Sequence, residues 1–254
     1  MIFNGSRLLL LLITLLSAQV EAKVFSFNSE SFAAYLKGNL YPGRFENTLN
    51  SESHGTSSTF DSYLQYNLAG EFGFVYARPR VQIRFGLELI HPLDKKDESG
   101  TNAAGASLYS MTSELTVMVP KVGVDVTVKS WAQARAYVGG TVGYASLAAR
   151  NSYTFTAAGT TQYGIGDFYE ELRAGAPQYE GIIGYERVFS DSTTIAVEGG
   201  YRNLVFKDVK HNKDVTTFQG AVEKGDKAMN DDGSDRTLNL NQYHIGLNLR
   251  FWIH

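Results

Sequence analysis

Residues 243–253 of the chain read YHIGLNLRFWI, and this stretch decides the fold. Its odd positions carry the large apolar side chains Tyr243, Ile245, Leu247, Leu249, Phe251 and Ile253. Its even positions carry His244, Gly246, Asn248, Arg250 and Trp252. Only a β-strand sends alternate residues to opposite faces, so the stretch predicts a strand with one apolar and one polar face.

The same period of two recurs along the chain. It is clear at 64–76, 81–89 and 193–206, and weaker at 31–41, 109–129, 133–148 and 178–189. With the last strand, these segments predict eight β-strands. Within 109–129 the apolar positions change from odd to even, and Pro120 lies at the change, which predicts a β-bulge there.

The connections between these strands alternate between short and long. Tight turns are expected near 78–80, 129–131 and 190–192. Long polar connections are expected at 42–62, 91–108, 149–177 and 207–236. This alternation indicates an all-β, eight-stranded antiparallel up-and-down transmembrane β-barrel with short periplasmic turns and four long extracellular loops.

The first 22 residues have the layout of a signal peptide. Arg7 precedes the apolar run LLLLLITLL at 8–16, and Val20 and Ala22 supply small residues before an expected cleavage site. The run is too short to cross a bilayer as a helix. We therefore expect residues 1–22 to be removed and residues 23–254 to form one barrel domain, exported to the outer membrane of a Gram-negative bacterium.

Strand length and the placement of aromatic residues favour a barrel in lipid over a soluble, ligand-binding barrel. The segments are long enough for a tilted membrane crossing of about 9–11 residues. Aromatic residues near the expected periplasmic ends predict an interfacial girdle of Tyr76, Trp131, Phe189 and Trp252. Arg250 and Asn248 would enter hydrocarbon if the last strand faced the other way, so the apolar set is expected to face outward.

Charged residues on the opposite faces are then expected inside the barrel. They are Glu71, Arg84, Glu88, Arg135, Glu180, Glu186, Glu198, Arg202 and Arg250. Such a set forms either a structural network in which every charge is paired, or a gate in which the ion pairs exchange partners. The structural network is the favoured interpretation, because unpaired buried charges are costly.

Two strands resemble a known family. Residues 137–145, YVGGTVGYA, resemble a strand common in small OmpA-like outer-membrane barrels, with Thr141 in place of the middle glycine. Alternating residues of the last strand resemble the signal that the barrel-assembly machinery reads. These residues are Tyr243, Ile245, Leu247, Leu249 and Phe251. Members of the family usually end on Phe, whereas this chain ends on His254. The resemblance, which includes OmpX-like and OmpW-like barrels, implies an outer-membrane protein. Some relatives carry a periplasmic peptidoglycan-binding domain, which we do not expect in this chain.

An eight-stranded barrel is filled by its own side chains, which argues against a general porin. We expect a structural role with surface interactions through the external loops, and the alternative is a narrow channel for ions or small solutes. The expected partners are outer-membrane lipid, lipopolysaccharide, the assembly machinery and an unidentified extracellular partner of the loops. The 254 residues have a formal net charge of −3, so no nucleic-acid partner is expected.

Catalytic and metal-binding candidates are weak. The chain has no cysteine, which excludes disulfides and thiolate chemistry. His244 could serve lipid A chemistry, but no second catalytic group accompanies it in the sequence. Residues 230–235, NDDGSD, are similar to a calcium loop but lack a glutamate in the twelfth position, so a solvated loop is favoured. We expect neither an enzyme nor a cofactor.

Overall fold

The computed structural model describes residues 26–27, 29–42, 57–59, 66–92, 97–102, 104–218, 220–229 and 235–253. The predicted signal peptide and residues 230–234 of the calcium-like loop lie outside these ranges.

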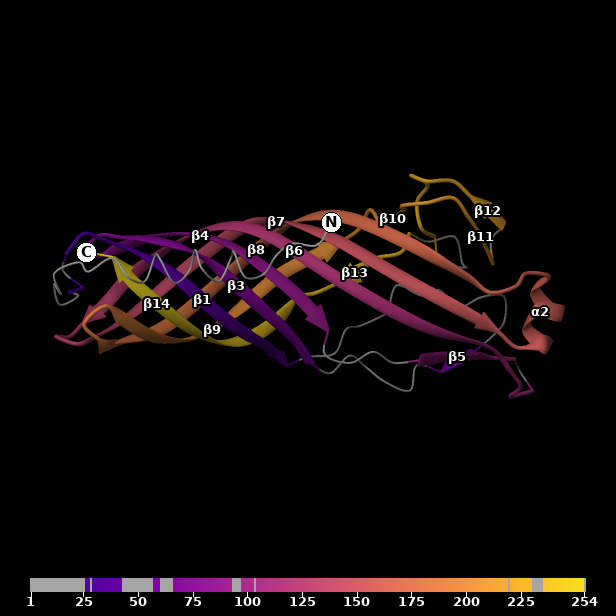
Figure 1. Ribbon diagram of the computed structural model, residues 1–254, viewed down its shortest axis with the longest axis horizontal. Coiled ribbons are helices and arrows are strands. Elements are labelled where there is room, and N and C mark those ends of the chain that lie inside the picture. The colour runs from indigo at the N-terminus through magenta and orange to yellow at the C-terminus, as the bar shows by residue number, and fades with distance from the viewer. Residues whose placement is uncertain are drawn as a thin grey trace, which may run out of the picture.

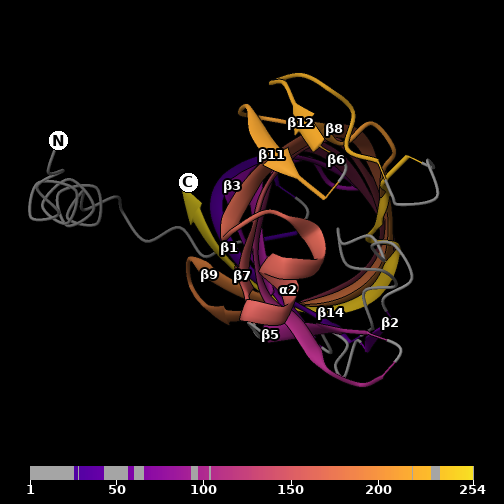
Figure 2. The ribbon, with the colours of Figure 1, turned by 90° about the vertical axis from the view of Figure 1, so that its right-hand side faces the viewer.

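Eight strands form a closed antiparallel ring (Figures 1 and 2). In chain order they are β1 (Ser31–Pro42), β3 (Tyr66–Ala77), β4 (Val81–Pro92), β6 (Ser107–Ser130), β7 (Ala134–Phe155), β8 (Phe168–Ser190), β9 (Thr193–Phe206) and β14 (Gln242–Ile253). Each pairs with the next, and β14 closes the ring by pairing with β1, where Leu36 lies opposite Leu249. The predicted eight-stranded up-and-down barrel is confirmed.

The two ends of the barrel differ. Tight turns at 78–80, 131–133 and 191–192 join strands at the left end of Figure 1. The small elements are β2 (Ser57–Thr59), β5 (Asp97–Thr101), α2 (Ala157–Tyr163), β10 (Lys210–His211), β11 (Val215–Thr217), β12 (Gly220–Val222) and β13 (Leu238–Asn239). Of these, β5, α2, β11 and β12 lie at the right end of Figure 1. Thr156 caps α2 by accepting the Gly159 N–H, and Gly164 ends it at φ 70°. No helix of the described ranges is long and apolar enough to cross a membrane.

Three neighbouring strands are about twice as long as the others. β6, β7 and β8 have 24, 22 and 23 residues, whereas β1, β3, β4 and β14 have 12 each. The predicted loop at 149–177 is therefore wrong in extent, because strand continues to Phe155 and resumes at Phe168. The predicted loop at 91–108 likewise contains β5, which pairs with β6.

The predicted bulge at Pro120 is also wrong. β6 keeps one register with β4 through Leu87 opposite Pro120, and with β7 on both sides of the proline. Its register shift lies near the turn end instead, between Thr127 and Lys129. The odd residues of β6 face inward on both sides of Pro120. The apolar side chains change from odd to even positions there because the interior changes from apolar to charged, and the strand itself does not shift.

Two regions of the barrel are defined by this change. The belt is the part between the short turns and the level of Pro120, and its outward side chains are apolar. Examples with their exposed fractions are Leu36 56%, Phe72 51%, Phe85 56%, Val124 45%, Ile183 67%, Val197 54% and Leu247 53%. A soluble barrel would have required Phe85 and Leu247 inside. The extension is the part beyond Pro120, formed by 107–119, 145–155 and 168–176 with α2 and the connection 207–241.

Of the four residues predicted for the interfacial girdle, Trp252 does not belong to it. Tyr76, Trp131 and Phe189 lie at the short-turn end, and Trp131 and Phe189 are 45% and 74% exposed. Trp252 is only 4% exposed, because it shares the inward parity of Arg250. Its indole N–H donates to Thr194 Oγ1 at 2.9 Å, and it packs with Phe27 in a small core that covers the turn end of the interior.

Candidate functional site: the charged interior and the extension

All nine predicted interior charges lie inside the belt, and none is more than 4% exposed: Glu71, Arg84, Glu88, Arg135, Glu180, Glu186, Glu198, Arg202 and Arg250. Lys37, Lys121 and Asp125 join them, which the sequence interpretation missed. Together they make six carboxylates and six permanent cations.

The layer nearest the short turns is organised around Glu186. Arg135 Nε donates to Glu186 Oε2 at 2.7 Å, and Arg250 donates to the same oxygen at 2.9 Å. Gln82 Oε1 accepts from Arg250 at 2.6 Å and also from Arg135. Thr194 donates to the other oxygen of Glu186. One carboxylate on β8 therefore joins cations from β7 and β14.

The middle layer is organised around Glu198 on β9. Lys37 Nζ lies 2.6 Å from Glu198 Oε2, while Arg84 and Arg250 lie 3.2 Å and 3.3 Å from Oε1. Tyr137 donates its hydroxyl to the same Oε1 at 2.5 Å. Three cations from three different strands thus share one carboxylate. Removing that carboxylate would leave all three in a buried site.

The third layer reverses the arrangement, because one cation serves three carboxylates. Lys121 Nζ lies 2.8 Å from Glu71, 3.0 Å from Glu88 and 3.2 Å from Glu180. His244 Nε2 lies 3.0 Å from the other oxygen of Glu180, and its ring packs against that of Tyr41. His244 is therefore part of the charged network.

Lys121 and Asp125 were missed although they lie on the face opposite to an apolar set that was expected to point outward. Val122, Val124 and Val126 do point outward, and Lys121 and Asp125, at the odd positions of the same strand, are buried. Lys37 was missed because the strand at 31–41 is only weakly alternating. A usable signal exists in both strands, since each places a charge at the position of opposite parity to its exposed apolar residues.

Beyond the third layer the interior turns apolar. Its core includes residues from seven of the ring strands, together with Val209, Ala228, Leu238 and Leu240 from the connection between β9 and β14. Ile90, Val117, Leu204 and Phe206 are essentially unexposed. The charged network is therefore covered on both sides: by Trp252 and Phe27 at the turn end and by this apolar core toward the extension.

A second buried charge cluster lies in the extension, and it was not expected from the sequence. Arg236 donates to Glu170 Oε1 at 2.7 Å, Asn151 donates to the same oxygen at 3.0 Å, and Tyr153 at 3.3 Å. His211 Nδ1 lies 3.9 Å from Glu170 Oε2. Burial holds the pKa of His211 below its ordinary value, and Glu170 opposes that shift.

Aromatic residues surround this cluster. Tyr109, Tyr153, Phe155, Tyr163 and Phe168 come from β6, β7, α2 and the start of β8. Phe218, from the connection between β9 and β14, contacts all five rings at centroid distances of 4.9–5.6 Å. The connection thus reaches the extension with one aromatic ring and one guanidinium.

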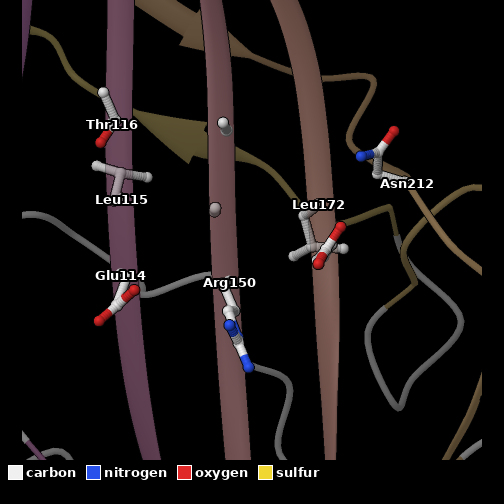
Figure 3. Close-up of a pocket in the computed structure, with 9 residues that line it drawn as sticks. Glu114, Leu115, Thr116, Arg150, Leu172 and Asn212 are labelled. Carbon is white, nitrogen blue, oxygen red and sulfur yellow. The ribbon is translucent and has the colours of Figure 1, made fainter. Parts of the chain in front are cut away.

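A pocket of about 250 Å³ lies on β6, β7 and β8 within the extension (Figure 3). Leu115, Ala149 and Leu172 of the apolar core line it together with charged residues, among them Glu114 and Arg150. The Arg150 guanidinium lies 4.0 Å from the ring centre of Tyr169. The described residues contain no group of three or more His, Asp or Glu arranged to hold a metal ion.

The predicted assembly residues lie on the outer face of β14. Tyr243, Ile245, Leu247 and Phe251 are 71%, 63%, 53% and 42% exposed, and Leu249 is partly exposed. Their reading by the assembly machinery stays a prediction.

No protein-family model and no curated protein sequence matches the chain. Several solved structures have a similar arrangement of strands. Neisserial surface protein A is 8% identical, with 87% of this chain and 96% of that chain covered at a TM-score of 0.41. OprG from Pseudomonas aeruginosa is 11% identical (89% and 97% covered, TM-score 0.45), and Ail of Yersinia pestis is 8% identical (88% and 99%, TM-score 0.40). Similarity of this degree says nothing about function, which must be inferred from the residues of this chain.

Proposed function

We propose that the protein is a non-conducting outer-membrane anchor that holds the extension outside the cell for contact with a partner. Export would use the signal peptide at 1–22, with cleavage near Ala22. The observation that carries the proposal is the reversal along β6. Val122, Val124 and Val126 face outward in the belt, while Val117 and Val119 face inward beyond Pro120.

Strand length supports an extension outside the bilayer. A tilted strand crosses a membrane with about 9–11 residues, at roughly 3.3 Å per residue. The 24 residues of β6 are more than twice that number. Ser110, Glu114 and Thr116 point outward and are exposed in its distal half, where hydrocarbon would penalise them.

The interior network supports an anchor rather than a conduit. Its six cations face six carboxylates, and the central ion pairs have distances of 2.6–3.3 Å. An ion path would require these pairs to separate inside a dry interior, and the apolar core blocks the extension side. The outward apolar belt supports contact with outer-membrane lipid and lipopolysaccharide, and the exposed face of β14 supports a role in barrel assembly.

Orientation can be tested because the chain has no cysteine, so single cysteines can be introduced without background. Gln162→Cys in α2 and Asp191→Cys in a short turn are both at exposed positions. Intact cells treated with a membrane-impermeant maleimide should label Gln162→Cys, and should label Asp191→Cys only after the outer membrane is permeabilised. Recovery of the protein in the soluble periplasm, or labelling with the opposite polarity, would overturn the proposal.

Conduction is tested separately in planar lipid bilayers. The purified protein should give no stable unitary currents. Stable currents that Glu198→Gln or Arg250→Ala alters would replace the anchor with a narrow ion path.

A further inference from the structure

The connection between β9 and β14 covers a surface whose composition is unusual for a loop contact. Part of it is held to the ring, because β10 pairs with β8, β13 pairs with β9, and Val209, Ala228, Leu238 and Leu240 lie in the apolar core. Its β11 and β12 have three residues each, and a two-stranded ribbon of that size has little stability alone. In the distal part of the extension the connection contributes Phe218 and Arg236.

Phe218 fills an aromatic cage. Its ring centre lies 4.9 Å from that of Tyr163 and 5.3 Å from those of Tyr109 and Tyr153, in edge-on or tilted arrangements. Aromatic pairs at such distances add about 0.5–1.5 kcal/mol each beyond area burial.

Arg236 occupies a buried carboxylate. Glu170 is 1% exposed, and the Arg236 guanidinium donates to its Oε1 at 2.7 Å. Within the described ranges, neither the other oxygen, Oε2, nor His211 Nδ1 at 3.9 Å from it has a hydrogen-bond partner, and both atoms are buried. Asn151 and Tyr153 from β7 hold the Glu170 carboxylate in place as a hydrogen-bond acceptor. The connection uses only one of its two oxygens.

We infer that the inner face of the extension is a binding site for a ligand that combines an aromatic ring with a guanidinium or ammonium group, and that Phe218 and Arg236 occupy this site in cis. Aromatic residues and arginine are the side chains that dominate binding hot spots, and a buried carboxylate discriminates strongly for a cation. The inference rests on the proposed function, because the site must face the outside to meet a partner. Such a ligand, for example a peptide segment with Phe followed by Arg, would displace Phe218 and Arg236. Binding would thereby be coupled to local release of the connection.

The probe for this site is acetyl-Phe-Arg-amide, and the matched control ligand is acetyl-Phe-citrulline-amide, which has the same shape without the charge. The full-length protein carrying Phe218→Ala and Arg236→Ala should bind the arginine probe in calorimetric titration at least tenfold more tightly than wild type does. It should bind the citrulline ligand at least tenfold more weakly than the arginine probe. Adding Glu170→Gln should abolish the difference between the two ligands.

Loop release is checked independently by trypsin cleavage at Lys213 or Lys224, which should accelerate in the double variant. A released connection with no probe binding overturns the inference, and so does binding that Glu170→Gln leaves unchanged. The maleimide labelling of Gln162→Cys distinguishes these failures from failure of the proposed function, since correct orientation would persist.

If the double variant does not fold, Arg236→Ala alone supplies the test. The truncation leaves a guanidinium-sized space beside Glu170, so methylguanidinium should restore the trypsin resistance of the connection in a saturable manner. Absence of rescue at concentrations that leave the wild type unchanged overturns the inference.

Discussion

In the belt half of β6, Val122, Val124 and Val126 face outward and Lys121 and Asp125 face inward. Beyond Pro120 the same strand, in the same register, has Leu115, Val117 and Val119 inside, and past the exposed Met118 its outer face carries polar residues such as Thr116 and Glu114. One continuous sheet therefore buries charged side chains in the belt and apolar side chains in the extension. The difference lies in the surrounding solvent, because the belt is suited to lipid and the extension to water.

The two interiors are stabilised by different forces. The belt interior depends on ion pairs, which are directional and intolerant of a missing partner. The extension interior depends on apolar packing, which loses free energy in proportion to the space vacated. Substitutions should therefore have different magnitudes and different causes on the two sides of Pro120.

The largest effect is expected from Glu198→Ala in the belt. Lys37, Arg84 and Arg250 would lose their shared carboxylate, and an uncompensated buried charge costs about 3–5 kcal/mol. Urea unfolding in detergent micelles, followed by the heat-modifiable gel shift, measures the loss. Glu223→Ala, at an exposed position of the extension, should change stability by less than about 0.5 kcal/mol. Equal effects of the two substitutions would contradict a paired network.

Leu204→Ala tests the apolar interior. Leu204 is unexposed within the core beyond the charged layers, so its truncation should cost about 2–5 kcal/mol. The same unfolding assay measures the loss. Thr154→Ala, on the exposed outer side of the extension, is the control and should cost little.

The sequence was sufficient to predict the ring of eight strands, because period-two alternation is strong wherever one face meets lipid. Arg84, Glu198 and Arg250 could be assigned to the interior by the same logic, since hydrocarbon excludes charge. The tight turns predicted at 78–80 and 190–192 lie at 78–80 and 191–192, whereas the one predicted at 129–131 lies at 131–133 because β6 continues to Ser130. These features depend only on neighbours along the chain.

The extension could not be predicted in the same way. Its strands present Glu171 and Arg173 to the outside and Leu172 to the inside, a pattern that polar composition alone made look like a loop. The pairing of Glu170 with Arg236 joins residues 66 positions apart and depends on how the connection folds back. Local pattern carries no information about such a contact.

A matched pair of substitutions on one strand tests where the two regions meet. Val124→Arg places a cation on the outer face of the belt and should cost about 2–4 kcal/mol if that position is near the bilayer midplane. Thr116→Arg, on the same face of β6 beyond Pro120, should cost less than about 0.5 kcal/mol because the position is exposed to water. Refolding into lipid vesicles measures both. If Thr116→Arg costs as much as Val124→Arg, the bilayer reaches past Pro120 and the extension is shorter than proposed.

The smallest expected effect is the pH dependence of how firmly the connection is held in the extension. Burial lowers the pKa of His211 in the folded protein, so on acidification the unfolded or released form takes up a proton first. Its contribution to loop closure is therefore complete above the ordinary pKa of about 6.5 and is lost as pH falls below it, by at most about 1.4 kcal/mol per pH unit. Glu170 and Asp226 oppose this loss, and Arg236 adds to it.

Trypsin cleavage of the connection should thus be faster at pH 5.5 than at pH 7.5 after correction for the activity of the protease. The substitution His211→Leu should reduce this difference between the two pH values. A pH dependence that survives His211→Leu would assign the effect to another group, whereas its absence in the wild type would mean that His211 is protonated equally in both forms.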